Sequence, residues 1–204
     1  MTVRVKICGV TRSTDATDAA AAGADLIGLN FFSGSRRAVT IERARSIVAV
    51  LPPGVLRVGV FVNATRAMVA EALKAVPLDI LQFSGDETPD DLKGWPCQVI
   101  RAVRLSSADD ARRAVAEFPC DFVLCEGLAG GGYGGAGVGF DWRLAEPVPR
   151  ERLIVAGGLN GANVGEAVRR LGPWAVDVAS GVETAPGIKN VVLMREFIEN
   201  AKAA

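Results

Sequence analysis

The chain alternates short apolar runs with alanine-rich segments in which apolar residues recur at helical spacing. The apolar runs favour β-branched residues and predict strands at residues 3–7, 26–32, 56–62, 80–83, 98–103, 122–125, 153–156 and 175–179. The intervening segments predict helices at residues 14–22, 41–50, 64–76, 107–117, 162–171 and 191–201, with a weaker helix near Asp90. A strand is therefore followed by a helix along nearly the whole chain.

Alternation of strands and helices predicts a parallel sheet, because each connection between parallel strands needs a crossover segment. The predicted strands are apolar at most positions, as in sheets that are buried on both faces. An open doubly wound sheet also alternates in this way, but it usually has fewer strands. Eight units in 204 residues predict a small α/β fold, a (β/α)8 barrel. We expect a single domain over residues 1–204, since no linker-like tract divides the chain.

Composition and charge place the chain among compact proteins with small partners. Half of the residues are hydrophobic, which excludes global disorder. Lys plus Arg and Asp plus Glu each number 23, so the chain lacks the basic excess of a nucleic-acid-binding protein. We therefore expect no nucleic-acid partner, and a charged partner should be small and locally recognised.

The N-terminal segment and the cysteines indicate the compartment. No stretch approaches the apolar length of a membrane span, so no membrane partner is expected. Residues 1–8 predict a strand that contains Arg4 and Lys6, not a signal peptide, which favours a cytoplasmic protein with reduced thiols. The four cysteines show no Cys-x-x-Cys spacing and predict no zinc or redox site. All but the first are interpreted as small buried hydrophobic residues.

The chain contains no histidine, which narrows the chemistry. Proton transfer near neutral pH must fall to Cys, Asp, Glu, Lys or the single tyrosine, Tyr133. Nucleophiles activated by histidine and metal sites built on histidine are excluded.

Glycines at two strand ends point to a phosphate site. In barrels of this kind the active site lies in the loops at the carboxyl ends of the strands. Gly157 and Gly158 follow the seventh predicted strand, and Ser180 and Gly181 follow the eighth. Backbone N–H groups of these two loops often bind phosphate, and glycine lets the backbone approach the anion closely. Tight turns use the same residues, but the coincidence of both pairs predicts a small phosphorylated substrate.

Two reactive side chains also lie at predicted strand ends. Cys8 ends the first strand, and Lys6 lies on the same side of that strand, where its cation favours the thiolate. A packed thiol is the alternative interpretation of Cys8. Glu126 ends the sixth strand and is either a functional or a surface carboxylate. The glycine-rich run 127–139 that follows lacks the Gly-Lys-Ser/Thr ending of a nucleotide loop. It is interpreted as a flexible loop or as a mobile lid with Tyr133 at its tip.

A set of motifs runs along essentially the whole chain. The most specific is the ordered combination of Lys6-Ile7-Cys8-Gly9, Ala156-Gly157-Gly158-Leu159, Asp177-Val178 and Ser180-Gly181-Val182-Glu183. Further segments are Gly28-Leu29-Asn30-Phe31, Ser35 with Arg37, Val58-Gly59-Val60-Phe61-Val62, Leu81-Gln82, Gly85-Asp86-Glu87 and Phe140-Asp141-Trp142. Together they resemble the motifs of the phosphoribosylanthranilate isomerases of tryptophan biosynthesis.

The resemblance implies an Amadori rearrangement of N-(5-phosphoribosyl)anthranilate to 1-(2-carboxyphenylamino)-1-deoxyribulose 5-phosphate. A general acid protonates the furanose oxygen and opens the ring, and a general base then removes the proton from C2. By this resemblance the base is Cys8, and the acid is the residue that ends the sixth strand, here Glu126. Arg37 is expected to hold the anthranilate carboxylate through a bidentate contact. No cofactor or metal is needed.

The chain departs from the family pattern at four positions. Glu126 stands where the family has Asp, and Ser84 replaces the histidine of Leu-Gln-Leu-His-Gly. Ala136 and Ala179 replace a common Thr and Ser, which removes hydroxyls but leaves backbone amides for the phosphate. The change at Glu126 matters most, because misplacing a catalytic group by about 1 Å can cost roughly 10²-fold in rate.

Three functions are open at this stage. The first is an active isomerase of this family, monomeric or homodimeric. The second is a non-catalytic homologue that binds a phosphorylated ligand, which the changes at Glu126 and Ser84 suggest. The third is a related barrel isomerase that acts on another aminated phosphosugar. Retention of Cys8, Arg37 and both phosphate loops favours the first.

Overall fold

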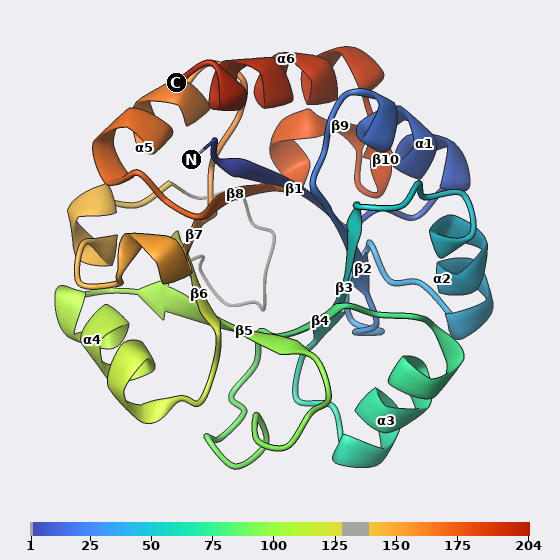
Figure 1. The fold of residues 1–204 in the computed structure, drawn as a ribbon, viewed down its shortest axis with the longest axis horizontal. Helices are drawn as coiled ribbons and strands as arrows, with labels where there is room; N and C mark the ends of the chain where they lie inside the picture. Colours follow the sequence, from blue (N-terminus) through green and yellow to red (C-terminus); the bar gives the residue numbers. More distant parts are fainter. Residues whose placement is uncertain (1, 128–138) are drawn as a thin grey trace.

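The computed structural model describes residues 2–127 and 139–204, which form a closed eight-stranded barrel surrounded by helices (Figure 1). The barrel strands follow one another in sequence order around the ring, and each is parallel to its neighbours. β1 pairs with β8 and closes the ring. The strands are β1 (Arg4–Cys8), β2 (Leu26–Asn30), β3 (Leu56–Phe61), β4 (Ile80–Phe83), β5 (Gln98–Leu105), β6 (Phe122–Gly127), β7 (Leu153–Val155) and β8 (Ala175–Val178). The predicted (β/α)8 barrel is confirmed.

Helices cover the outside of the barrel (Figure 1). They are α1 (Ser13–Ala21), α2 (Ile41–Val48), α3 (Arg66–Ala75), α4 (Ala108–Glu117), α5 (Val164–Leu171) and α6 (Val191–Lys202). Polar side chains fix several of their starts: Thr40, Thr65 and Asn190 accept backbone N–H groups from the first turns of α2, α3 and α6. Among the residues that the structure describes, no helix is both long and apolar enough to cross a membrane.

The predicted helix near Asp90 is absent, and β4 is joined to β5 by turns. Backbone bonds from Asp91 to Thr88 and from Lys93 to Asp90 make single turns that do not continue. The Thr88 hydroxyl and N–H both donate to the Asp91 carboxylate, and this local bonding competes with a helix. Gly94, with φ of 71°, and Pro96 then end any helical run.

Further short elements were not predicted from the sequence. η1 (Trp142–Ala145) and η2 (Arg150–Arg152) precede β7, and η3 (Ser180–Val182) follows β8. After η3, β9 (Glu183–Ala185) and β10 (Ile188–Lys189) pair as an antiparallel hairpin before α6 begins. This hairpin lies beside the carboxyl ends of β8 and β1, where Lys189 Nζ donates to the Ala179 carbonyl and the Thr11 hydroxyl donates to the Gly187 carbonyl.

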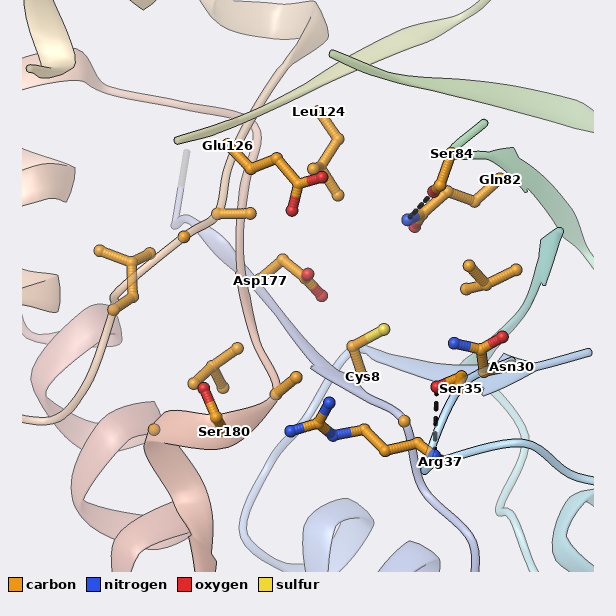
Figure 2. A pocket seen from close by; sticks show the side chains of 18 of the residues that line it. Cys8, Asn30, Ser35, Arg37, Gln82, Ser84, Leu124, Glu126, Asp177 and Ser180 are labelled. Carbon is orange, nitrogen blue, oxygen red and sulfur yellow. Dashed lines mark hydrogen bonds between the residues drawn. The ribbon is translucent and has the colours of Figure 1, made fainter. Parts of the chain in front are cut away.

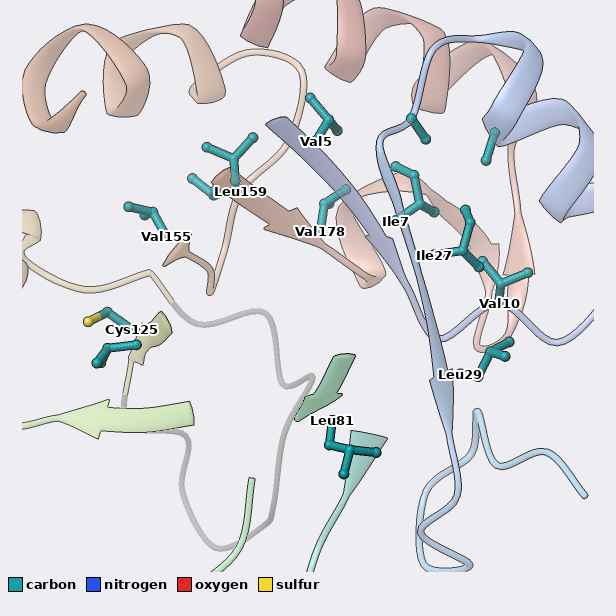
Figure 3. Packing of buried hydrophobic residues seen from close by; sticks show 14 of the residues in the cluster. Val5, Ile7, Val10, Ile27, Leu29, Leu81, Cys125, Val155, Leu159 and Val178 are labelled. Atoms are coloured by element: carbon teal, nitrogen blue, oxygen red, sulfur yellow. The ribbon is translucent and has the colours of Figure 1, made fainter. Parts of the chain in front are cut away.

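Alternate residues of each strand pack into two separate cores. One set faces the helices, where Figure 3 shows Val5, Ile7, Ile27 and Leu29 packed with apolar side chains of other elements. The other set faces the barrel interior and forms a second apolar cluster that includes Leu26, Val58, Ile80, Ile100, Phe122, Leu124 and Ile154. Both faces of the sheet are therefore buried, which explains the nearly continuous apolar character of the strands.

Farther along the strands the inward face becomes polar. Residues on one face of a strand are two positions apart, so Ile80 is followed by Gln82 and Leu124 by Glu126. On β1 and β8 the corresponding inward residues are Cys8 and Asp177. This change in polarity places the reactive side chains together at the carboxyl ends of the strands.

Candidate active site

A cavity at the carboxyl ends of the barrel strands brings together side chains from many parts of the chain (Figure 2). Every site residue predicted from the sequence lines this cavity: Cys8, Glu126, Arg37, Gly157, Gly158, Ser180 and Gly181. Figure 2 shows Cys8 and Glu126 pointing into it from different strands. Asn30, Gln82, Ser84 and Asp177 contribute further polar side chains.

Cys8 lies beside a buried ion pair that connects the first and last strands. The Lys6 ammonium donates to Asp177 Oδ1 at 2.8 Å, and the lysine side chain is fully buried. A Cβ atom at Gly28 would lie 2.8 Å from the Cys8 sulfur and 3.2 Å from Lys6 Nζ. Glycine at position 28 therefore leaves the space that both side chains occupy.

Burial and charge act in opposite directions on Cys8. Burial raises the pKa of the Cys8 thiol above its ordinary value, and the charge of Asp177 raises it further. The Lys6 cation lowers the pKa of Cys8. Burial opposes the charge of Lys6 itself, but Asp177 and Cys8 outweigh burial, and the pKa of Lys6 is raised. As its place in the strand predicts, Lys6 favours the thiolate form of Cys8. Burial outweighs this effect, so Cys8 is a thiol in the free protein.

Glu126 has the properties of a proton donor. Burial raises the pKa of its carboxyl group to about 7, against an opposing contribution from Arg104. Arg104 Nε lies 3.8 Å from Glu126 Oε1, and the two residues are register neighbours on β5 and β6. A carboxyl group with this pKa is substantially protonated near neutral pH and can release its proton to a bound molecule.

Arg37 is held by the carboxylate of Glu183, a pairing that the sequence did not predict. Its Nε and Nη2 donate to the two oxygens of Glu183, at 2.8 and 2.7 Å. A guanidinium group has five N–H donors, so this contact leaves the edge formed by the two terminal nitrogens. A bidentate contact between Arg37 and a substrate carboxylate would have to use that outer edge.

Gln82 was not among the predicted site residues. Its side chain is buried, and its Nε2 donates to the Ser84 hydroxyl at 3.1 Å. Its Oε1 has no hydrogen-bond partner among the described atoms. A buried acceptor without a partner costs about 1–3 kcal/mol, which a donor on a bound molecule would relieve. The inward alternation from Ile80 to Gln82 was the available sequence signal for this residue.

The two glycine-containing loops are in contact. Gly157 and Gly158 have φ of 78° and 69°, a region that favours glycine. Gly181 packs so closely against the carbonyl of Leu159 that a Cβ atom would collide with it. The loops after β7 and β8 therefore form one continuous wall of the cavity. Of the predicted glycine-rich lid, residues 128–138, including Tyr133 and Ala136, lie outside the described residues.

Comparisons with known proteins match one family along almost the whole chain. A family model described as N-(5'-phosphoribosyl)anthranilate (PRA) isomerase matches residues 5–200. The N-(5'-phosphoribosyl)anthranilate isomerase of Pseudomonas paraeruginosa is 48% identical over 202 residues, which cover 98% of this chain and 96% of that protein. The crystal structure of phosphoribosyl anthranilate isomerase from Thermotoga maritima superimposes with a TM-score of 0.89 at 41% identity, covering 99% of this chain and 100% of that one.

A second similar crystal structure contains a bound ligand. It contains a phosphoribosyl anthranilate isomerase in complex with reduced 1-(o-carboxyphenylamino)-1-deoxyribulose 5-phosphate. It aligns with a TM-score of 0.85 at 38% identity, covering 99% of this chain and 100% of that chain.

Proposed function

The chain belongs to the N-(5'-phosphoribosyl)anthranilate isomerase family, and from this premise we propose how its cavity carries out the reaction. The protein is an isomerase of tryptophan biosynthesis that converts N-(5-phosphoribosyl)anthranilate to 1-(2-carboxyphenylamino)-1-deoxyribulose 5-phosphate. The observation that supports the residue assignment best is the meeting of Cys8 and Glu126 in one cavity lined by both glycine loops.

Ring opening is assigned to Glu126. Its carboxyl proton passes to the furanose oxygen as the bond from that oxygen to C1 breaks. The lone pair of the substrate nitrogen forms the C1–N double bond and gives an iminium ion. A carboxyl group with a pKa of about 7 suits this step, because general acids work best when their pKa is near the operating pH. The extra methylene of Glu relative to Asp does not prevent its side chain from reaching the cavity.

Proton abstraction is assigned to Cys8. The thiolate removes the proton from C2, and the C2 electron pair flows to the iminium nitrogen to give an enolamine. The enolamine then tautomerises to the ketone of the product. Lys6 stabilises the thiolate form during this step, because its buried ammonium group interacts favourably with the charge on Cys8.

Binding is assigned to residues at opposite ends of the substrate. Backbone N–H groups of Gly157, Gly158, Ser180 and Gly181 hold the phosphate. The outer edge of Arg37 holds the anthranilate carboxylate through charge-assisted hydrogen bonds. Both contacts fix the sugar between the acid and the base, which is the positioning that such catalysis requires.

Steady-state turnover tests this assignment. The purified protein should consume phosphoribosylanthranilate, followed by loss of anthranilate-type fluorescence, and it should restore growth of a tryptophan auxotroph. Failure of the wild-type protein in both assays would instead favour a non-catalytic ligand-binding protein. Turnover of a different aminated phosphosugar in its place would favour the related-isomerase alternative.

Two further properties belong to the proposal. A cytoplasmic location is supported by four free cysteines, since thiols stay reduced in that compartment. The oligomeric state is expected to be a monomer or a homodimer, which sedimentation of the purified protein would decide.

A further inference from the structure

We propose that Glu183 is a positioning residue that fixes Arg37 for the carboxylate of the substrate, with Lys189 holding Glu183 in place. This inference rests on the proposed carboxylate contact of Arg37 and adds the residues that make the contact specific. Glu183 and Lys189 lie on the hairpin of β9 and β10, at the edge of the cavity.

The contact between Arg37 and Glu183 is buried and bidentate. The exposed fractions of the two side chains are 10% and 5%, so water competes weakly for their hydrogen bonds. The residues are 146 positions apart in the sequence, and the contact joins the loop after β2 to the loop after β8. A guanidinium group paired along its Nε edge in this way cannot rotate without breaking both bonds.

Lys189 fixes the other side of the carboxylate. Its ammonium group, which is fully buried, donates to Glu183 Oε1 at 2.9 Å and to the carbonyl of Ala179 at 3.0 Å. The backbone N–H of Gly187 also donates to Glu183 Oε1, at 3.1 Å. Glu183 therefore accepts from three different residues, and its side chain has one defined position.

The charges of the cluster suit an anionic ligand. Two cations, Arg37 and Lys189, surround one carboxylate, so the cluster carries a net positive charge. Burial opposes the charge of Glu183, but hydrogen bonds from both cations outweigh burial and lower the pKa of its carboxyl group. The Ala179 carbonyl bound by Lys189 directly precedes Ser180 and Gly181. Lys189, and not Glu183, contacts the backbone before this loop, so a change at Glu183 leaves that contact in place.

The test compares two inhibitors that differ in a single group. One is reduced 1-(o-carboxyphenylamino)-1-deoxyribulose 5-phosphate, and the other is the same molecule without the aryl carboxylate. Wild-type protein should prefer the carboxylated inhibitor by roughly 10-fold or more, because charge-assisted bidentate bonds are strong. Glu183→Gln and Glu183→Asp should reduce this preference to about 3-fold or less while leaving affinity for the carboxylate-free inhibitor unchanged. Glu183→Asp keeps the charge balance, so it remains informative if Glu183→Gln does not fold.

Matched variants separate the possible failures. Asp109→Asn removes an exposed partner of Arg112 and should preserve the full preference. Arg37→Met should abolish the preference. If Arg37→Met abolishes it while both Glu183 variants keep it, the positioning role of Glu183 is overturned but the Arg37 contact stands. If Arg37→Met keeps the preference, the Arg37 contact is overturned and this inference with it. Equal loss of affinity for both inhibitors in the Glu183 variants would show a purely structural role and would also overturn the proposal.

Discussion

Cys8 and Glu126 lie in the same cavity, but they titrate in the order opposite to that of most acid–base pairs. The proposed acid has a pKa of about 7, and the proposed base has a pKa raised above the ordinary thiol value. The reactive state, with Glu126 protonated and Cys8 ionised, is therefore a minor fraction of the free protein at every pH. Its population is the product of the protonated fraction of Glu126 and the ionised fraction of Cys8.

This order predicts a specific pH profile of kcat/KM, which reports on groups of the free enzyme. Below about pH 7 Glu126 stays protonated, so the rate rises with pH as the Cys8 thiolate accumulates. Between about pH 7 and the raised pKa of Cys8, loss of the acid offsets gain of the thiolate, and the profile is flat. Above the pKa of Cys8 the value of kcat/KM falls, because Cys8 is already fully ionised and the protonated fraction of Glu126 continues to decrease.

Glu126→Gln tests the assignment of the break near pH 7 to Glu126. The amide cannot deliver a proton, so kcat should fall by roughly 10² or more. The residual rate should rise with pH until Cys8 is ionised and then stay level, with no break near pH 7. A break near pH 7 that survives this substitution would mean that another group causes it.

Cys8→Ser tests the base. The serine hydroxyl is a far weaker base than a thiolate, so kcat should fall by roughly 10²–10⁴-fold, while the affinity for reduced product analogue stays close to wild type. Pre-steady-state and steady-state fluorescence assays measure both quantities. Retention of more than about a tenth of wild-type kcat would exclude Cys8 as the base.

Some residues of the site could be placed from the sequence, and others could not. Cys8 and Glu126 end apolar runs, so the strand pattern alone placed them at the reactive end of the barrel. The pairing of Arg37 with Glu183 could not be predicted, because it joins positions 146 residues apart through a hairpin that has no hydrophobic signature. The net upward shift in the pKa of Cys8 could not be predicted either. The sequence shows the neighbouring Lys6, but it does not show how deeply the folded barrel buries the end of β1.

At the level of secondary-structure elements, periodicity identified those whose apolar faces are buried. All eight barrel strands were predicted because both of their faces are covered, whereas the short hairpin of β9 and β10 is held by side-chain contacts of Glu183 and Lys189. The helix near Asp90 was wrongly predicted because acidic residues that favour a first turn also bond locally, as Asp91 does with Thr88. The loop after β8 depends on a close approach to its neighbour after β7, which only the folded barrel reveals.

Gly181→Ala tests that close approach. The added Cβ atom collides with the carbonyl of Leu159, so the loop must shift away from the Gly157–Gly158 turn and misplace the proposed phosphate contacts. Since misplacement by about 1 Å can cost roughly 10²-fold, kcat/KM should fall at least about 10-fold. Gly54→Ala is the control, because Gly54 lies before β3, at the opposite end of the barrel, and a Cβ atom there has no neighbour within 4 Å among the described residues. Any strain of Ala at its φ of 94° acts on stability and not on the cavity. Equal activity of the two variants would remove the loop after β8 from the phosphate site.

At the scale of the whole molecule, the ring is closed by the pairing of β1 with β8 and by the buried ion pair between Lys6 and Asp177. Removing one member of a buried pair leaves an uncompensated charge, which typically costs about 3–5 kcal/mol. Lys6→Met should therefore lower the free energy of unfolding in urea by about that amount. Lys6→Met combined with Asp177→Asn should recover part of the loss. A Lys6→Met protein as stable as wild type would show that the pair does not hold the barrel closed.

The span of that ion pair also has a consequence during synthesis. Lys6 and Asp177 are 171 positions apart, and at roughly 5–20 residues per second the ribosome needs roughly 10–35 s to supply the second partner. Throughout this interval β1 has an unpaired edge, and its Val5 and Ile7 side chains can associate with other nascent chains. Arg4 and Lys6 place charges within this segment, as gatekeeper residues do. We therefore expect ribosome-bound chains truncated before β8 to aggregate faster when they carry Lys6→Met, because this substitution removes a charge from the apolar segment.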